Sequence, residues 1–350
     1  MLTSIDRLVG YFKIMVHVRD IAQHFLLIIL VFWLLQLALL YFYGPNISDE
    51  DDVHLCMENK INMTRTCRPK CQHGFYSLPG MSHCEPWLTC SEIKNELKIL
   101  RKFAYGAVKA IYQAEIRGKT VVYNVLRTKD YEEDFQHGLK MLRDLQPSKY
   151  VTQLLGYCDD SFVTEYHPLG SARDLDKLLS VALGLNYSIS VRFQLCISYV
   201  HVVHFLHSGP LGTRVMCDSN DLNKLLSQFL VNPDLTFVAN DLDALPQVHK
   251  GHGVKCGHRE LFGDFVAPEQ LWPHDEPYND DLMPTYDEKT DIWKVPDVCN
   301  HFLGTSDDTL YIQFHLHKIH KQCKDHNPKN RPSAAHILDY YKQIKLTLGL

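Results

Sequence analysis

The sequence has no excess of basic residues. Its 36 Lys and Arg side chains are outnumbered by 41 Asp and Glu, and the formal net charge is −5. A nucleic-acid-binding surface needs clustered cations, so the composition argues against a nucleic-acid partner. Internal repeats and low-complexity tracts are also absent, which excludes a repeat architecture. The 350 residues, 45% of them hydrophobic and 22% charged, are enough for one two-lobed globular domain with additional segments.

Charged side chains are missing from residues 24–43 near the N-terminus. At about 1.5 Å per residue, this apolar run is long enough to cross roughly 30 Å of hydrocarbon as a helix. Arg7, Lys13 and Arg19 precede it and four acidic residues, 49–52, follow it. The basic flank predicts a cytoplasmic tail over 1–23, a single-span signal anchor over 24–43 and a lumenal remainder, which is a type II topology. The alternatives, a cleaved signal peptide and a buried helix, fit less well because the run is too long for a signal peptide.

Zinc-finger spacing is missing from the cysteine cluster that follows. Five of the 11 cysteines lie between the apolar run and residue 91, at Cys56, Cys67, Cys71, Cys84 and Cys90. Because they contain no C-x-x-C pair and no histidine pair at finger spacing accompanies them, zinc is less favoured than disulfides in an oxidising lumen. Three glycosylation sequons, at Asn46, Asn62 and Asn186, lie on the same predicted side of the membrane. We therefore expect a lumenal cysteine-rich segment over 44–97.

Residues 98–350 contain the motifs of a protein kinase with several members replaced. The segments 216–218, 240–243 and 267–269 stand in the order of the H-R-D, D-F-G and A-P-E motifs. In ordinary kinases the first aspartate accepts the proton of the substrate hydroxyl and the second binds Mg²⁺. The resemblance predicts an α+β, bilobal protein-kinase-like fold. It implies that Asp218 acts at the acceptor hydroxyl and that Asp241 binds Mg²⁺ or Mn²⁺ beside ATP.

The expected smaller lobe lacks the usual phosphate-binding lysine. Asn124 occupies its position in the strand 120–126, and the glycine-rich loop retains only Gly106. Triphosphate charge must still be neutralised, and Lys109 is the one lysine within residues 104–111. We expect Lys109 to replace the missing cation, with Ala104 and Gly106 also near the nucleotide.

Helix C of the kinase pattern is expected over 131–145, with Gly138 in place of the glutamate that pairs with the lysine. Glu133 and Asp134 lie about one turn earlier, on nearly the same helix face. They are the candidate carboxylate partners of Lys109. The segment 162–171 matches the strand and hinge that hold adenine, which makes Glu165 and Tyr166 the candidate adenine contacts.

The second metal ligand of a kinase is an amide between the two aspartates. Counting forward from Asp218 gives Asn223, and counting back from Asp241 gives Gln228, so the loop is about five residues longer than usual. Gln228 is favoured because an apolar strand pattern follows it. Asn223 and Asn220 remain alternatives.

Two structural pairs are also predicted. The A-P-E glutamate Glu269 is expected to form a buried ion pair with Arg331. Cys217 replaces the H-R-D arginine, which in many kinases grips an activation-segment phosphate. Residues 244–272 contain no Ser, Thr or Tyr but one cysteine, Cys256. A Cys217–Cys256 disulfide would fix this segment in place of the phosphate clamp.

Four segments make the resemblance more specific: 84–90, 164–170, 215–221 and 263–273 are similar to the family of protein O-mannose kinases. That resemblance implies transfer of the ATP γ-phosphoryl to the carbon-6 hydroxyl of mannose. The acceptor would be a GalNAc–GlcNAc–mannose trisaccharide on α-dystroglycan, and the location the endoplasmic reticulum membrane. The losses in the kinase motifs favour an alternative, a catalytically inactive, membrane-anchored binding module.

Overall fold

The computed structural model describes residues 32–33, 54–182, 188–249 and 251–350. The predicted cytoplasmic tail, nearly all of the predicted membrane anchor, and the sequons at Asn46 and Asn186 lie outside these ranges. The chain divides into two units, Met1–Val53 and His54–Leu350. The fold described below is that of the second unit.

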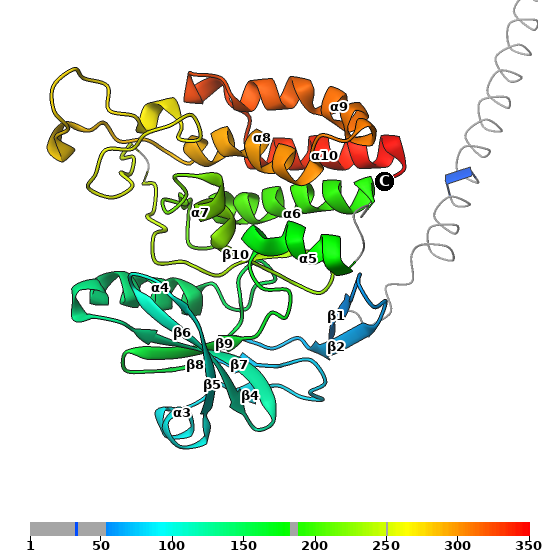
Figure 1. The fold of residues 1–350 in the computed structure, drawn as a ribbon, viewed down its shortest axis with the longest axis vertical. Coiled ribbons are helices and arrows are strands. Elements are labelled where there is room, and N and C mark those ends of the chain that lie inside the picture. The colour runs from blue at the N-terminus through cyan, green and yellow to red at the C-terminus, as the bar shows by residue number, and fades with distance from the viewer. Residues whose placement is uncertain (1–31, 34–53, 183–187, 250) are drawn as a thin grey trace, which may run out of the picture. The chain divides into compact units, whose positions relative to one another are not determined.

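The smaller lobe is built on an antiparallel sheet of five strands in the order β5-β6-β7-β9-β8 (Figure 1). The strands are β5 (Lys98–Tyr105), β6 (Lys109–Ile116), β7 (Lys119–Leu126), β8 (Leu154–Cys158) and β9 (Ser161–Glu165). In β6 the buried residues Ala110, Ala114 and Ile116 are an even number of positions apart, as expected for a sheet with one covered face. Helix α4 (Glu132–Asp144) follows η1 (Lys129–Tyr131) and buries Phe135, Gly138 and the leucines beside them.

The cysteine-rich segment packs onto this lobe. It contains β1 (His54–Glu58), β2 (Arg65–Pro69), β3 (Phe75–Tyr76), β4 (Glu85–Pro86) and α3 (Cys90–Glu96). Tyr76, Leu88 and Ile93 share one hydrophobic cluster with Val121 and Val163 of the sheet. The described part of the segment is therefore built into the same core as the five-stranded sheet.

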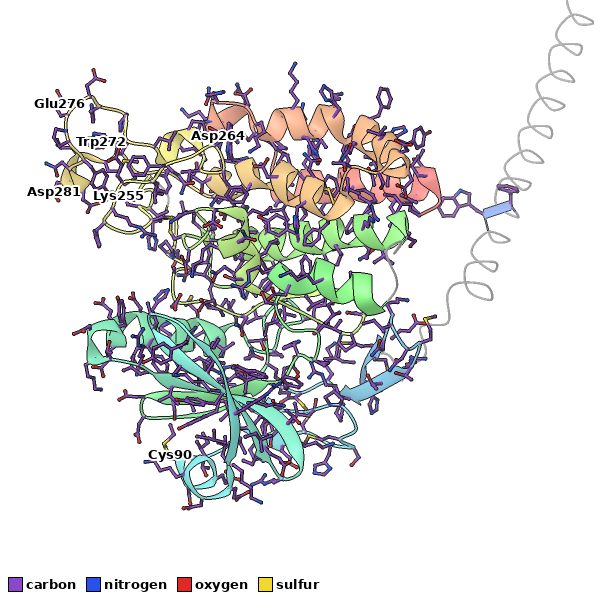
Figure 2. The ribbon with its side chains drawn as sticks, viewed as in Figure 1. Cys90, Lys255, Asp264, Trp272, Glu276 and Asp281 are labelled. Carbon is purple, nitrogen blue, oxygen red and sulfur yellow. A yellow bond between two sulfur atoms is a disulfide. The ribbon has the colours of Figure 1, made fainter. Side chains whose placement is uncertain are left out.

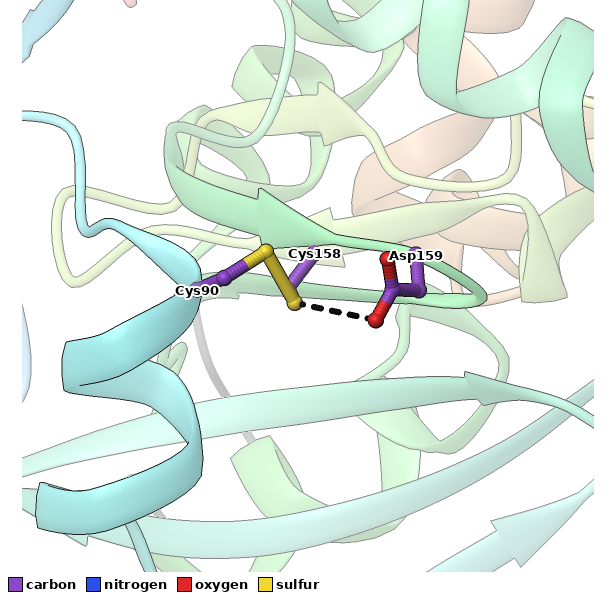
Figure 3. Close-up of side chains that lie close together, drawn as sticks. All are labelled: Cys90, Cys158 and Asp159. Atoms are coloured by element: carbon purple, nitrogen blue, oxygen red, sulfur yellow. Dashed lines mark hydrogen bonds between the residues drawn. A yellow bond between two sulfur atoms is a disulfide. The ribbon is translucent and has the colours of Figure 1, made fainter.

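The five clustered cysteines all form disulfides, as predicted. The bridges are Cys56–Cys67 across the β1–β2 hairpin, Cys71–Cys84, and Cys90–Cys158 from α3 to β8. Within the described ranges, one group of side chains has metal-ligand chemistry at close range, Cys90, Cys158 and Asp159. Figure 3 shows that its two sulfur atoms are bonded to each other, so they are not thiolates that could bind zinc.

The larger lobe is mainly helical (Figure 1). It consists of α5 (Leu175–Ala182), α6 (Ile189–Ser208), α7 (Leu222–Ser227), α8 (Lys289–Leu303), α9 (Asp307–Cys323) and α10 (Ala334–Leu348), with β10 (Phe229–Val231) paired to β11 (Phe237–Ala239). Short 3₁₀ turns complete it: η2 (Ala172–Asp174), η3 (Pro268–Gln270), η4 (Asp280–Leu282) and η5 (Pro328–Asn330). The two-lobed α+β fold predicted from the motifs is thus observed.

Helix α6 forms the centre of the larger lobe. It is the one helix among the described residues that is long and apolar enough to cross a membrane. More than half of it is buried, against α8 and α10 among others, which is the usual reason for a helix that is apolar all round. The Cys196–Cys299 disulfide, which the sequence patterns did not predict, joins α6 to α8.

The predicted Glu269–Arg331 pair is confirmed. Nη1 of Arg331 donates to Oε1 of Glu269 at 2.6 Å and Nη2 donates to Oε2 at 2.7 Å, while the Arg331 side chain is fully buried. Its Nε donates to the carbonyl of Asp325 at 2.8 Å. The pair joins η3 to the loop before α10.

Arg331→Met should lower the free energy of unfolding by about 3–5 kcal/mol, because it leaves the Glu269 carboxylate largely buried without its partner. Lys94→Met is the matched control. Lys94 pairs with Asp159 at 2.9 Å, but both side chains are more than half exposed, so the cost should stay below about 1 kcal/mol. Urea unfolding of the two variants checks the ranking, and similar losses would contradict it.

Candidate active site

Asp218 lies in the loop between α6 and α7. Its Oδ2 is 2.5 Å from Nζ of Lys224 and accepts a long hydrogen bond of 3.4 Å from Nε2 of Gln228. The predicted excess length of this loop is folded into α7, whose N-cap Asp221 accepts from the backbone N–H of Lys224 at 2.9 Å. The short helix carries Lys224 and ends at Gln228, so it brings a cation and an amide to the same carboxylate.

Asp241 follows β11, and its charge is met by Lys109. The Lys109 ammonium contacts Oδ1 of Asp241 and lies 3.7 Å from Oδ2 of Asp243. Burial would lower the pKa of Lys109, but the two carboxylates outweigh it and raise the pKa above its ordinary value. Burial likewise favours protonated Asp241, yet Lys109 holds the pKa of that carboxyl below its ordinary value. The predicted substitute cation is thus located at the predicted metal-binding aspartate.

The predicted partners of Lys109 on helix α4 are wrong. Glu133 and Asp134 are exposed in the first turn of α4, whereas Asp241 and Asp243 supply the carboxylates. A Cβ atom added to Gly138 would lie 3.2 Å from the backbone and Cβ of Asp243, so this glycine gives Asp243 room beside the helix. The pKa of Asp243 is raised to about 7 by burial and by the neighbouring Asp241 charge. The sequence signal was available, since Asp243 stands at the glycine position of D-F-G.

Asn124, in the ordinary lysine position, is a buried part of the sheet. It is 6% exposed, and its Nδ2 donates a weak hydrogen bond of 3.4 Å to Oγ1 of Thr164 on β9. A neutral amide can be buried there with one hydrogen bond, and the nearby cation Lys109 lies on the neighbouring strand β6.

Gln228 is the amide that the fold places between the two aspartates. Its side-chain Nε2 donates to Asp218. Its backbone carbonyl accepts from the backbone N–H of Asn240, next to Asp241, at 2.9 Å. Gln228 is 1% exposed, whereas Asn223 lies on the exposed side of α7 and Asn220 is partly buried in the loop. The geometry favours Gln228 as the candidate amide ligand.

The glycine loop and the hinge face each other. The N–H of Gly106 donates to the carbonyl of Lys109 at 2.9 Å and closes the turn between β5 and β6, while Ala104 pairs with Ile111 at the end of β5. The ring of Tyr166 is stacked on that of Phe103 in β5, with centroids 5.9 Å apart and planes at 11°. The Glu165 side chain is directed elsewhere, to Arg68 of β2.

The predicted Cys217–Cys256 disulfide is present. It lies in a small cluster with Val215, Val254 and Tyr286, and the Tyr286 hydroxyl accepts from the N–H of Cys256 at 2.5 Å. The bridge ties the residue before Asp218 to the activation segment. Figure 2 shows Lys255, just before the bridge, and Trp272 and Glu276, after it, at the margin of the larger lobe.

Buried polar groups support the catalytic loop from α8. Asp291 accepts from the N–H of Met216 at 3.1 Å, and the fully buried Lys294 donates to Oγ of Ser219 at 2.5 Å. Burial lowers the pKa of Lys294 despite its carboxylate neighbours. Lys294, Lys224 and Arg68 were not identified from the sequence, since their roles depend on contacts distant along the chain or inside the longer loop.

The arrangement suits charge neutralisation around a phosphoryl group. A carboxylate and an amide, from Asp241 and Gln228, offer the hard oxygen atoms that Mg²⁺ accepts, and Asp218 lies beside Gln228. Lys109 already compensates Asp241 and is placed to compensate phosphate as well. The residues present therefore fit a divalent ion bound with a nucleotide.

Comparison with known proteins gives the following similarities. The chain is 50% identical to "Protein O-mannose kinase" of Gallus gallus over 285 residues, which cover 79% of this chain and 80% of that protein. It is 45% identical to the Homo sapiens protein of the same name, over 85% of this chain and 87% of the relative. The Xenopus laevis protein is 43% identical over 91% and 88%. No protein-family model matches the chain.

Cys256→Ser should lower the free energy of unfolding by up to about 4 kcal/mol, because it opens a loop of 39 residues in the unfolded chain. Cys217→Ser and the double variant provide the control. If the two residues are bridged, all three variants lose a similar amount, whereas two independent thiols would give additive losses. Urea unfolding distinguishes these outcomes.

Proposed function

We propose, because this chain belongs to the family of protein O-mannose kinases, that it phosphorylates the carbon-6 hydroxyl of mannose in a GalNAc–GlcNAc–mannose trisaccharide on α-dystroglycan, with ATP as the donor. The chain is a phosphotransferase, and its identity of 43–50% with O-mannose kinases over 79–91% of its length carries the proposal. Such similarity spans both lobes and the intervening site. The structure of the acceptor glycan and the identity of the protein that carries it are both part of the proposal.

The proposed roles follow the geometry of the site. Asp218 orients the acceptor hydroxyl and takes its proton, and Lys109 and Lys224 supply positive charge near the transferred group. Asp241 and Gln228 would hold the divalent ion, for which we propose Mg²⁺ or Mn²⁺. When bound, that ion supplies charge neutralisation at the phosphate oxygens. Glu165 and Tyr166 belong to the hinge proposed to hold adenine.

An active kinase is favoured over an inactive binding module because residues at unusual sequence positions place their charges beside Asp218 and Asp241. Lys109 comes from β6, Asp241 follows β11 and Lys224 comes from α7, yet their charges compensate one another at one site. Phosphoryl transfer depends mainly on positioning and electrostatics, so residues in new sequence positions serve if they reach the same points.

We also propose that the protein is a single-span type II protein of the endoplasmic reticulum membrane with a lumenal catalytic domain. Five disulfides among the described residues support an oxidising compartment. Asn62, one of the sequons, is exposed. Protease digestion of intact microsomes tests the orientation, since digestion of the C-terminal domain without detergent would overturn it.

Transfer of labelled phosphate from ATP to the synthetic trisaccharide should occur with the wild-type protein and fall to background in Asp218→Asn and Asp241→Asn. Both substitutions keep the side-chain volume while removing the charge that acts at the reaction centre. Peptides without glycan should not be labelled. A folded wild-type protein that binds Mg²⁺–ADP but transfers no phosphate would identify a binding module instead.

Lys109→Met should lower kcat/KM by at least about 100-fold, because it removes the cation proposed to compensate phosphate charge in a largely buried site. Asn124→Ala, at the ordinary lysine position, should change kcat/KM less than about tenfold because its contact with Thr164 is weak. Steady-state kinetics with the same trisaccharide rank the two variants. The reverse ranking is incompatible with relocation of the cation to Lys109.

A further inference from the structure

The hinge presents its side chains alternately to two sides. Glu165 and Tyr166 are consecutive, and extended backbone places neighbouring side chains on opposite faces. Tyr166 meets Phe103 of β5 on one side, whereas Glu165 and His167 are buried on the other. The side chains of Glu165 and His167 are therefore available to hold the hinge backbone from behind.

A buried polar network occupies that rear side. Nη1 of Arg68, in β2, contacts Oε2 of Glu165 and donates to the carbonyl of Ser77 at 3.2 Å. Gln153 donates through Nε2 to the same Glu165 oxygen at 3.1 Å and to the Ser77 carbonyl at 2.7 Å. Nε2 of His167 lies 3.2 Å from Oε1 of Glu165. Both carboxylate oxygens of Glu165 are thus engaged.

The charge of Glu165 depends on this network. Its side chain is 9% exposed and that of Arg68 is 13% exposed. Burial by itself would raise the pKa of Glu165, but the opposing charge of Arg68 and the contact with His167 outweigh burial and lower the pKa below its ordinary value. Removing Arg68 would leave a buried carboxylate with weaker compensation.

Arg68 is also a polar link between the β1–β2 hairpin and the hinge. Two cavities, of about 270 and 290 Å³, lie beside it, and both are lined by Met57, Arg68, Glu165 and Asn232. The hairpin is therefore not packed continuously against the hinge. The Cys56–Cys67 disulfide joins β1 to β2 one residue before Arg68 and fixes the strand that carries this arginine.

We propose that Arg68 is a positioning residue for the nucleotide, which fixes the hinge from behind through Glu165. This inference rests on the proposed function, in which the hinge backbone binds adenine. Arg68 does not contact the nucleotide. Its Nη1 joins the Glu165 carboxylate and the Ser77 carbonyl at once, and its charge compensates the buried carboxylate.

The test measures binding of Mg²⁺–ADP to the full-length protein in detergent by isothermal titration, together with steady-state kinetics. Arg68→Met should weaken ADP binding by about tenfold or more and raise KM for ATP by a similar factor. Both kcat and KM for the trisaccharide should change less than about threefold, because the acceptor side of the site is intact. A general loss of structure would not produce this separation.

Three further variants make the test decisive. Arg117→Met is the matched control, because Arg117 lies in the same lobe and pairs with Glu85 and Glu96 at 3.0 and 2.9 Å without reaching the hinge network. It should bind ADP as the wild type does. The double variant Arg68→Met/Glu165→Gln leaves no unpaired charge and should still bind ADP more weakly. Arg68→Lys, which keeps a charge able to compensate Glu165, should show a smaller loss.

The outcomes separate this inference from the proposed function. Wild-type affinity for ADP in folded Arg68→Met overturns the inference and leaves the kinase function intact. If Arg68→Met is not recovered folded, the double variant Arg68→Met/Glu165→Gln decides, and its binding ADP as tightly as the wild type overturns the inference. A wild-type protein that binds no Mg²⁺–ADP at all would contradict the proposed function itself.

Discussion

The contact of the Lys109 ammonium with Asp241 and Asp243 is the interaction on which the active-site arrangement depends. A largely buried ammonium needs carboxylate partners, and here both come from the segment after β11. Gly138 leaves space on α4 for Asp243, and the vacated lysine position on β7 holds the neutral Asn124. Each departure from the kinase pattern is therefore linked to the others. A glutamate restored at position 138 would crowd Asp243, whose atoms lie 3.2 Å from a Cβ placed there.

Around Asp218, too, other residues stand where ordinary kinases have their conserved ones. Where kinases use a short catalytic loop, this chain folds the additional residues into α7, which brings Lys224 and Gln228 to Asp218. Where kinases use an arginine and a phosphate to order the activation segment, this chain uses the Cys217–Cys256 bridge. A covalent tie needs no regulatory phosphate, which fits a segment without Ser, Thr or Tyr over 244–272.

Local spacing in the sequence predicted some of the contacts in the structure. The predicted substitute cation Lys109 meets the predicted metal-binding Asp241, and the Glu269–Arg331 pair followed from kinase-motif positions. The catalytic roles of Asp218, Asp241 and Lys109 stay predictions. Helix periodicity failed for Glu133 and Asp134, because the rotation of α4 and the depth of Asp243 are set by tertiary packing. Contacts between distant segments, such as Arg68 with Glu165 or Cys196 with Cys299, have no local signal. The predicted membrane anchor lies outside the described residues and remains a prediction.

The central claim is that Lys109 has taken over the role of the usual phosphate-binding lysine. A crystal structure of the protein with Mg²⁺, ADP and aluminium fluoride tests it most directly. The account predicts the Lys109 ammonium within about 3.2 Å of a phosphate or fluoride atom, the ordinary range of a hydrogen bond, with Asp241 bound to the metal ion. A complex in which Lys109 remains bound to Asp241 and another cation contacts the phosphates would contradict it.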